Sequence, residues 1–236
     1  MALYRHGLFL FIFVKKHQKS IEMEKFYKFT ETAVIDTFGI VTIRNCDELN
    51  NWLSNQGETV SNFENETLDM ALKRFEELSQ AWNEEELKMH FISPILSVAN
   101  PNILGVCKTY FERPLEGIVQ NKLMNIKTDC MVAQPKLGGD PNKPYFFLQE
   151  FKQKQLWGKT DPQGQMLVAM LLAQEFNADG KYLYGCFVKE NNWRFTTLKG
   201  LNYCVSRQYD ATQKTDLLQI VFILRKLKEL ITSRNS

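Results

Sequence analysis

The middle of the chain, from residue 106 to residue 151, carries a run of β-rich segments that constrains the fold more than any other feature. The segments are "GVCKTYFER", "LEGIVQNKLMNIKTDCMVAQ" and "PYFFLQEF", which Pro114, polar turns and "PKLGGDPNKP" separate. They predict three or four strands. Helical spacing of apolar residues occurs from residue 67, over 84–98, over 163–176 and over 215–232, with two further strand-like segments, "KYLYGCFVKE" and "NWRFTTLKG", between the last two. The order helix, strands, helix, strands, helix predicts a mixed α/β domain.

The chain is long enough for a substantial core, since it has 236 residues of which 44% are hydrophobic. It contains no internal repeat, so we expect one main domain with a small lead-in. We divide the sequence into residues 1–22, a leader or mis-assigned extension; residues 23–80, a lead-in of strands and helix followed by a loop; and residues 81–236, the main domain. The apolar run "LFLFIFV" in the first part is far too short to span a bilayer and lacks a cleavage site.

Charge and cysteine usage narrow the class of protein further. The formal net charge is +2, so any contact with nucleic acid has to depend on a local patch or groove. The five cysteines are scattered without a C-x-x-C pair, and the three histidines form no ligand pattern beside them. We therefore expect reduced thiols in a cytoplasmic protein that does not enter a membrane, without a disulfide framework or a structural zinc site.

The stretch "YFFLQEFKQK" is a buried strand by composition, yet it ends in Glu150 and Lys152. Alternate residues of a strand share a face, so these two side chains lie next to each other. Taken alone, the pair is typical of an exposed ion pair. Asp129 changes this interpretation. It lies in "IKTDCMVAQ", which is expected to be a strand antiparallel to "YFFLQEFKQK", with "LGGDPNK" as the turn between them. Two converging carboxylates suit Mg²⁺, and a neighbouring lysine can act on a water and a phosphate.

The helix in "NEEELKMHFISPIL" places Glu84 on the same face as Leu87, Phe91 and Ile95, so Glu84 is the member of its acidic triplet that is expected to point inward. The other two glutamates are expected to face solvent or to cap the helix, in a capping box with Asn83. A purely solvated helix start remains an alternative for all three.

The helix in "DPQGQMLVAMLLAQEF" begins at Asp161 and Pro162 and carries Gln163 and Gln165 in its first turn. We select Gln165 because its spacing to the apolar residues that follow keeps it against the sheet. A polar first-turn residue without a function is the alternative.

Asp129, the triplet Glu150-Phe151-Lys152 and the following helix with its glutamine together resemble the PD-(D/E)xK nuclease superfamily over roughly residues 84–195. The helix "NEEELKMHFISPIL" resembles the one that opens the nuclease domain of type I restriction subunits and related predicted nucleases. Thr128 stands where the family often has proline, which lowers the specificity of the match. The resemblance implies a restriction-endonuclease-like α/β fold, a mixed central sheet flanked by helices. The metal ligands that it implies are Asp129, Glu150, Glu84 and the carbonyl of Phe151.

In such a site Lys152 would serve the attacking water, and Gln165 would lie close to the metal and the phosphate. The implied function is a Mg²⁺- or Mn²⁺-dependent endonuclease of restriction or defence type, with DNA preferred over RNA although the same site would serve an RNA-cutting effector. A two-fold dimer or a restriction-type partner subunit is expected. The alternative is a catalytically inactive nuclease-fold module that binds nucleic acid or protein. Motifs for dinucleotide binding, P-loop phosphate binding and serine hydrolysis do not occur in the sequence.

Overall fold

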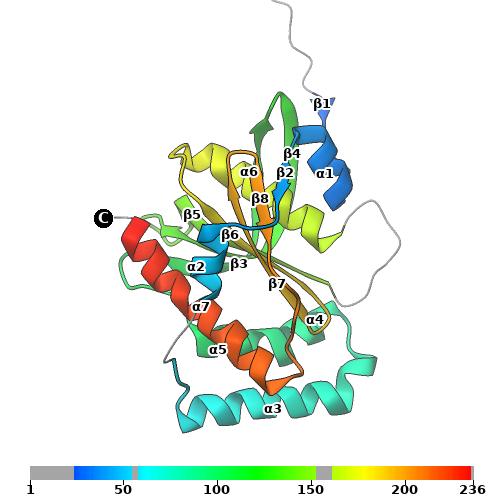
Figure 1. The fold of residues 1–236 in the computed structure, drawn as a ribbon, viewed down its shortest axis with the longest axis vertical. Helices are drawn as coiled ribbons and strands as arrows, with labels where there is room; N and C mark the ends of the chain where they lie inside the picture. Colours follow the sequence, from blue (N-terminus) through cyan, green and yellow to red (C-terminus); the bar gives the residue numbers. More distant parts are fainter. Residues whose placement is uncertain (1–23, 55–57, 153–160, 235–236) are drawn as a thin grey trace, which may run out of the picture.

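A computed structural model describes residues 24–54, 58–152 and 161–234, and it shows a mixed sheet with helices packed on both faces (Figure 1). The strands are β1 (Glu24–Lys25), β2 (Val41–Ile43), β3 (Lys108–Val119), β4 (Lys122–Pro135), β5 (Pro141–Lys152), β6 (Leu183–Lys189), β7 (Asn192–Lys199), β8 (Asn202–Val205) and β9 (Tyr209–Asp210). The helices are α1 (Glu31–Phe38), α2 (Asp47–Leu53), α3 (Asn62–Leu78), α4 (Glu84–Leu87), α5 (Ser93–Ala99), α6 (Pro162–Asn177) and α7 (Lys214–Arg234), with short helical turns at Ser79–Ala81 and Lys88–Ile92. The predicted mixed α/β class is confirmed.

The strand order β1-β4-β5-β6-β7-β8-β2 combines antiparallel hairpins with three parallel pairs, β1–β4, β5–β6 and β8–β2. Strands β3, β4 and β5 are antiparallel neighbours, β5 and β6 run parallel, and β6, β7 and β8 are antiparallel again. The parallel pair needs a crossover connection, and α6 supplies it. The carboxyl end of β5, with Glu150 and Lys152, therefore lies just before the segment that leads into α6.

Tight turns set the register of the long hairpins. Gln120 and Asn121 join β3 to β4, and both have positive φ, 45° and 65°. Two consecutive residues of this kind form the turn whose twist matches that of paired strands. Glu190, with φ 58°, plays a similar part between β6 and β7.

Two hydrophobic cores lie on opposite faces of the sheet. One contains buried side chains of α2, α3, α5 and α7, and the other contains those of α1 and α6. Strand β5 contributes to both, since Phe147 and Phe151 belong to the first core and Leu148 to the second. Figure 1 shows α3 at the end of the molecule opposite to β1 and α1.

The helix boundaries agree with the capping residues in the sequence, with one difference. Asp161 caps α6 and Pro162 is its first residue, as predicted. The structure also confirms the capping box of Asn83 and Glu86 at α4. Helix α3, however, begins at Asn62 and not near residue 67, because Ser61 and Glu64 form a second capping box. The polar segment "NQGETVSNFENE", which was expected to form the loop, therefore contributes its last residues to α3.

The helix predicted over 84–98 is continuous but irregular. Its α-helical parts, α4 and α5, flank a π-helical turn at Lys88–Ile92. Such turns insert extra backbone into a helix and occur frequently at functional sites. Here the turn begins at the residue that contacts Asp129, as described below.

The predicted lead-in packs into the same sheet and cores as the rest of the chain. Strand β2 pairs with β8, and β1 pairs with β4. Trp52 of α2 is fully buried and donates a hydrogen bond to the carbonyl of Ile223 in α7 at 2.8 Å. The proposed leader, residues 1–22, lies outside the described residues.

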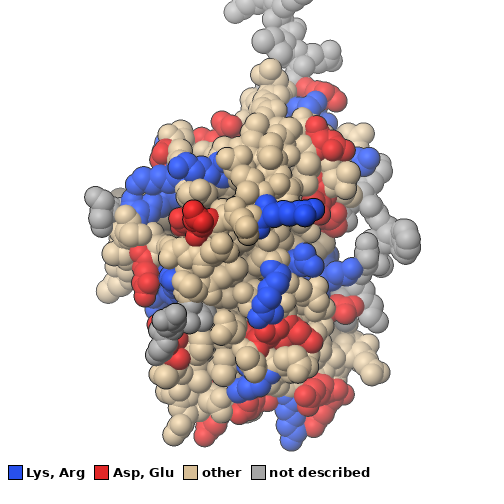
Figure 2. All heavy atoms as spheres, viewed as in Figure 1, with Lys and Arg blue, Asp and Glu red and all other residues tan. Residues whose placement is uncertain are grey.

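No helix in the described ranges combines the length and the apolar character needed to cross a membrane. All five cysteines are free thiols. On the face seen in Figure 2, basic and acidic side chains are interspersed. On this face, a binding surface for a polyanion would therefore have to be local.

Candidate metal and phosphate site

Two carboxylates meet where the pairing of β4 with β5 ends. The ladder runs as far as Cys130 opposite Gln149, so Asp129 and Glu150 are the next residues across from each other and share a face of the sheet. Asp129 is 8% exposed and Glu150 is 1% exposed. The Asp129 carboxylate accepts a hydrogen bond from the backbone N–H of Phe151 at 2.7 Å, in place of a further ladder bond. The structure thus brings together the two carboxylates predicted to share a metal ion.

Glu150 lies in an environment that disfavours its charge. Burial raises the pKa of Glu150 well above its ordinary value, and the adjacent Asp129 carboxylate raises it further. Lys152 and the backbone N–H of Asp129 act in the opposite direction. Among the described residues, no group hydrogen-bonds to the buried Oε1 of Glu150. Because a buried polar atom without a partner is costly, this oxygen is suited to receive a cation or a donor from a ligand.

A lysine that the sequence analysis did not select neutralises Asp129. The Nζ of Lys88 lies 2.8 Å from Oδ1 of Asp129 and 3.1 Å from Oε1 of Glu112. It also lies 3.2 Å from Glu85 and 3.4 Å from Glu84. Although burial disfavours the ammonium form, the carboxylates of Asp129 and Glu112 raise the pKa of Lys88. Lys88 is therefore the cation that balances an acidic cluster, which consists of Glu84, Glu85, Glu112 and Asp129.

The sequence contained a signal for Lys88. It follows Glu84 by four residues, the spacing at which helical side chains pair on one face. Its ammonium also lies 6.0 Å from the centre of the Phe151 ring. Only acidic residues of this helix were predicted to belong to the site, and the contact of Lys88 with Asp129 depends on how the π-helical turn packs against the sheet.

Lys152 and Glu84 meet beside the pair of carboxylates. The Nζ of Lys152 donates to Oε2 and Oε1 of Glu84 at 3.1 and 3.3 Å. Lys152 also lies close enough to Glu150 to lower its pKa. The carboxylate of Glu84 is thus linked to the site by ion pairs with two lysines, Lys88 and Lys152. In this arrangement it is not grouped with the other two carboxylates as a third ligand.

The remaining predicted residues have less direct positions. Gln165 is in the first turn of α6, and its Oε1 is buried without a hydrogen-bond partner in the described part of the chain. It makes no hydrogen bond to Asp129, Glu150 or Lys152. Gln163, the alternative, donates hydrogen bonds to Glu31 and to Tyr203. For Phe151 the structure gives a role to the amide and leaves the predicted role of the carbonyl untested.

The carboxylate pair fits Mg²⁺ better than a metal that needs many protein ligands. Within the described ranges, no group of three or more His, Cys, Asp or Glu side chains is arranged to hold a metal ion. Mg²⁺ commonly binds to one or two carboxylates, keeps several waters and takes further oxygens from phosphate. Asp129 and the unpartnered oxygen of Glu150 supply this minimal set. A metal there would compete with the ammonium of Lys88 for Asp129.

No protein-family model matches the chain, and no curated protein resembles it significantly. The function is therefore inferred from the site itself.

Proposed function

We propose that the protein is a metal-dependent nuclease that hydrolyses phosphodiester bonds, with Asp129 and Glu150 as the carboxylate ligands of Mg²⁺ or Mn²⁺. The observation that carries the proposal is that these two carboxylates are buried next to each other on neighbouring strands, where β5 ends and its pairing with β4 stops, with Lys152 beside them. This is the arrangement that the resemblance to PD-(D/E)xK nucleases predicted, on a mixed α/β fold. A DNA endonuclease of restriction or defence type, active in the cytoplasm, is the form of the proposal that we favour.

Each residue of the site has a distinct task in this scheme. A bound metal would polarise the phosphate and lower the pKa of a water. Asp129 and Glu150 would hold the cation, and their burial keeps bulk water from their inner face. Lys152 directs its ammonium at the attacking water and offsets the negative charge that develops on the phosphate. Glu84 positions Lys152 through the two hydrogen bonds at 3.1 and 3.3 Å.

A second candidate is a nuclease-fold module without catalytic activity. Lys88 favours it, because an ammonium 2.8 Å from Asp129 already satisfies the carboxylate that a metal needs. In such a module the acidic cluster and its lysine would be a structural ion network. The two candidates differ in one measurable property, which is whether Mg²⁺ or Mn²⁺ displaces Lys88.

The test is an incubation of the purified protein with plasmid DNA, single-stranded DNA and RNA, with Mn²⁺, with Mg²⁺ and with EDTA. We expect cleavage only with the metals. Glu150→Gln keeps the shape of the side chain and removes a ligand charge, so it should abolish Mn²⁺ binding by calorimetry together with cleavage. Lys152→Ala should retain metal binding and lose at least about 100-fold in turnover, because lysine acts on the reactants and not as a ligand.

Lys73→Ala is the matched control for the lysine variant, since Lys73 lies on α3 with its side chain 74% exposed. It should cleave like the wild type. Equal cleavage by the wild type and Lys152→Ala would place the chemistry elsewhere. No Mn²⁺ binding, together with no cleavage of any of the three substrates, would favour the inactive module.

A further inference from the structure

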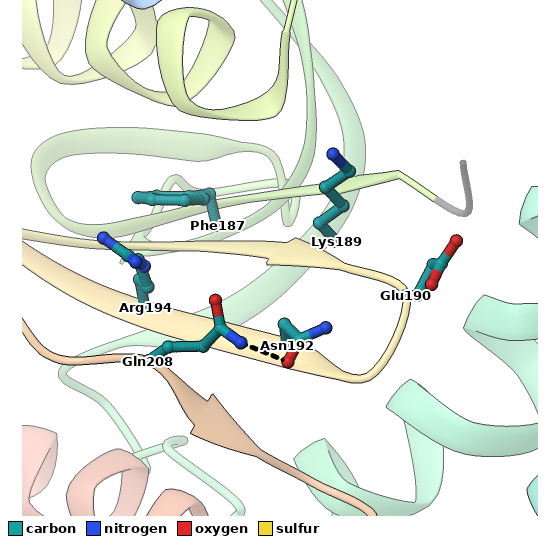
Figure 3. Close-up of a pocket in the computed structure, with 6 residues that line it drawn as sticks. All are labelled: Phe187, Lys189, Glu190, Asn192, Arg194 and Gln208. Carbon is teal, nitrogen blue, oxygen red and sulfur yellow. Dashed lines mark hydrogen bonds between the residues drawn. The ribbon is translucent and has the colours of Figure 1, made fainter. Parts of the chain in front are cut away.

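A polar cavity of about 550 Å³ opens beside the candidate site, at the ends of β6 and β7 (Figure 3). The residues that line it are Phe187, Lys189, Glu190, Asn192, Arg194 and Gln208. Figure 3 shows Phe187 and Arg194 at one end of the cavity and Lys189 and Glu190 at the other. Gln208 donates a hydrogen bond to Asn192 at 2.6 Å between them. The cavity thus combines two cations, one carboxylate and two amides, and none of these residues has a part in the chemistry above.

The register of the sheet places this cavity on the same face as the carboxylates. Glu150 pairs with Phe187 across β5 and β6, and Phe187 pairs with Arg194 across β6 and β7. Residues paired in this way point to one side of a sheet. Two strand spacings, about 10 Å, therefore separate Glu150 from Arg194 along the sheet.

A second row of pairs and a backbone hydrogen bond join the two sites more tightly. Lys152 pairs with Lys189, which pairs with Asn192. The backbone N–H of Glu190 donates to the carbonyl of Lys152 at 2.7 Å. The turn that carries the cavity is thus held directly to the strand end that carries the Glu-Phe-Lys triplet.

Arg194 is the residue that indicates a ligand. It is half-buried, yet in the described ranges its guanidinium makes no salt bridge and no side-chain hydrogen bond. Glu31, an acidic neighbour close enough to have its pKa influenced by Arg194, accepts a hydrogen bond from Gln163 instead. A guanidinium has five N–H donors in a planar fork that fits two oxygens of a phosphate. The guanidinium of Arg194 lines the cavity, so an anionic ligand bound there can supply the acceptor that the described residues do not.

We propose that this cavity binds a backbone phosphate of the nucleic acid whose scissile bond lies at Asp129 and Glu150. Arg194 binds two phosphate oxygens, the amides of Asn192 and Gln208 lie between the two ends of the cavity, and Lys189 adds a second positive charge at the other end. At a rise of about 3.4 Å per nucleotide, the separation of about 10 Å corresponds to roughly three nucleotides of a stacked strand. The proposal rests on the proposed function for its substrate class, but it concerns binding and not hydrolysis.

The experiment measures binding of the full chain to a fluorescent oligonucleotide by anisotropy over a series of salt concentrations, with EDTA present so that hydrolysis does not interfere. Arg194→Gln removes the charge and retains a polar side chain of similar reach. We expect it to weaken binding about tenfold, the loss typical of one charge-assisted hydrogen-bonded contact. The slope of log K against log salt should fall in magnitude by about 0.7 to 0.9, the equivalent of one phosphate contact. Lys189→Gln, at the strand end, should reduce affinity and slope in the same direction.

Arg74→Gln is the charge-matched control, because Arg74 is exposed on α3, away from the cavity. It should leave affinity and slope unchanged. If Arg194→Gln and Lys189→Gln both bind like the wild type, or if the wild type does not bind, the subsite is overturned. The subsite is also overturned if Arg194→Gln lowers the affinity for inorganic phosphate but not the affinity for the oligonucleotide, because the cavity would then bind only free anions.

This readout is separate from that of the proposed function. If the protein cleaves nucleic acid with metal and Lys152→Ala abolishes cleavage, but Arg194→Gln does not change the affinity for the oligonucleotide, the nuclease proposal stands and the subsite is overturned. A protein in which Arg194→Gln weakens binding, but which does not hydrolyse any substrate, would keep the subsite and remove the catalytic proposal.

Discussion

Lys88 carries much of the charge balance of the site at the scale of single residues. Its side chain is 13% exposed and that of Asp129 is 11% exposed, so their ion pair is shielded from water. Removing one partner of a buried pair leaves the other charge uncompensated. The acidic cluster therefore needs a cation, and either Lys88 or a metal can supply it.

Lys88→Met tests this exchange. The variant keeps most of the side-chain volume and loses the ammonium, so the free energy of unfolding without divalent ions should fall by about 3 kcal/mol. Mg²⁺ should then recover more stability in the variant than it adds to the wild type, because the metal no longer competes with an ammonium for Asp129. Urea denaturation with and without Mg²⁺ measures both quantities.

Lys73→Met, on an exposed face of α3, provides the comparison and should change stability by less than about 0.5 kcal/mol. The same gain from Mg²⁺ in Lys88→Met and in the wild type would mean that the ion does not bind next to Asp129.

At the scale of secondary-structure elements, short polar side chains fix where the helices begin relative to the sheet. The carboxylate of Asp161 accepts hydrogen bonds from the backbone N–H groups of Gly164 and Glu31, at 2.5 and 3.0 Å, and so links the start of α6 to that of α1. Gly164 makes this approach possible, because a Cβ there would lie 2.2 Å from the carbonyl oxygen of Phe29. The start of α6 is thus fixed in the part of the sheet face next to Arg194.

Asp216, in the first turn of α7, has a similar role and gives a pH-dependent prediction. It accepts a hydrogen bond from the backbone N–H of Asp210 at 2.9 Å and pairs with Arg207 at 2.8 Å. The hydrogen bond from Arg207 lowers the pKa of Asp216 below its ordinary value of 3.8, against the effect of burial. A lowered folded-state pKa means that the stabilisation is present above the unfolded value and is lost as the pH falls through the folded value.

Asp216→Asn should therefore lower the free energy of unfolding by about 1 kcal/mol at pH 7. The difference from the wild type should persist down to about pH 4 and close below it. Urea titrations at pH 7, 5 and 3 measure the difference directly. If the difference in the free energy of unfolding between the variant and the wild type stays constant over this pH range, the charge of Asp216 does not contribute to stability.

On the scale of the whole molecule, one sheet joins two cores, so a destabilising substitution in one core is expected to lower the stability of both. Three of the four tryptophans, Trp52, Trp82 and Trp193, belong to the core formed with α2, α3, α5 and α7. Met131 is fully buried in the other core, beneath α6. The fluorescence of one core can therefore report on a change made in the other.

Met131→Ala should lower the free energy of unfolding by about 3 kcal/mol, the usual cost of a cavity of this size. Because the sheet couples the cores, the denaturation midpoints by tryptophan fluorescence and by far-UV circular dichroism should shift together. Met70→Ala, on an exposed position of α3 that is 56% accessible, should shift neither by more than a small amount. A fluorescence midpoint that stays in place while the dichroism midpoint moves would show that the cores unfold separately.

Local pattern was sufficient for much of this architecture. The alternation and turns of residues 106–151 predicted the three long strands, and Asp161 with Pro162 and Asn83 with Glu86 marked two helix starts. The start of α3 was predicted too late, because the prediction used only the apolar spacing from residue 67 and missed the capping box at Ser61 and Glu64. For the site, the spacing of Glu150 and Lys152 and the hairpin to Asp129 were sufficient to predict neighbouring carboxylates, since antiparallel pairing follows from turn and register.

The sequence by itself determined the mixed α/β class and the strand ends at which acidic and basic residues gather, because both follow from periodicity and from contacts between neighbours along the chain. Only the tertiary structure decided which cation those carboxylates meet. Lys88 reaches Asp129 across 41 positions, and Glu84 reaches Lys152 across 68. Arg194 comes to the same sheet face as Glu150 through the register of three strands. Such contacts depend on the packing of helices against the sheet and on strand order, which a local pattern does not specify.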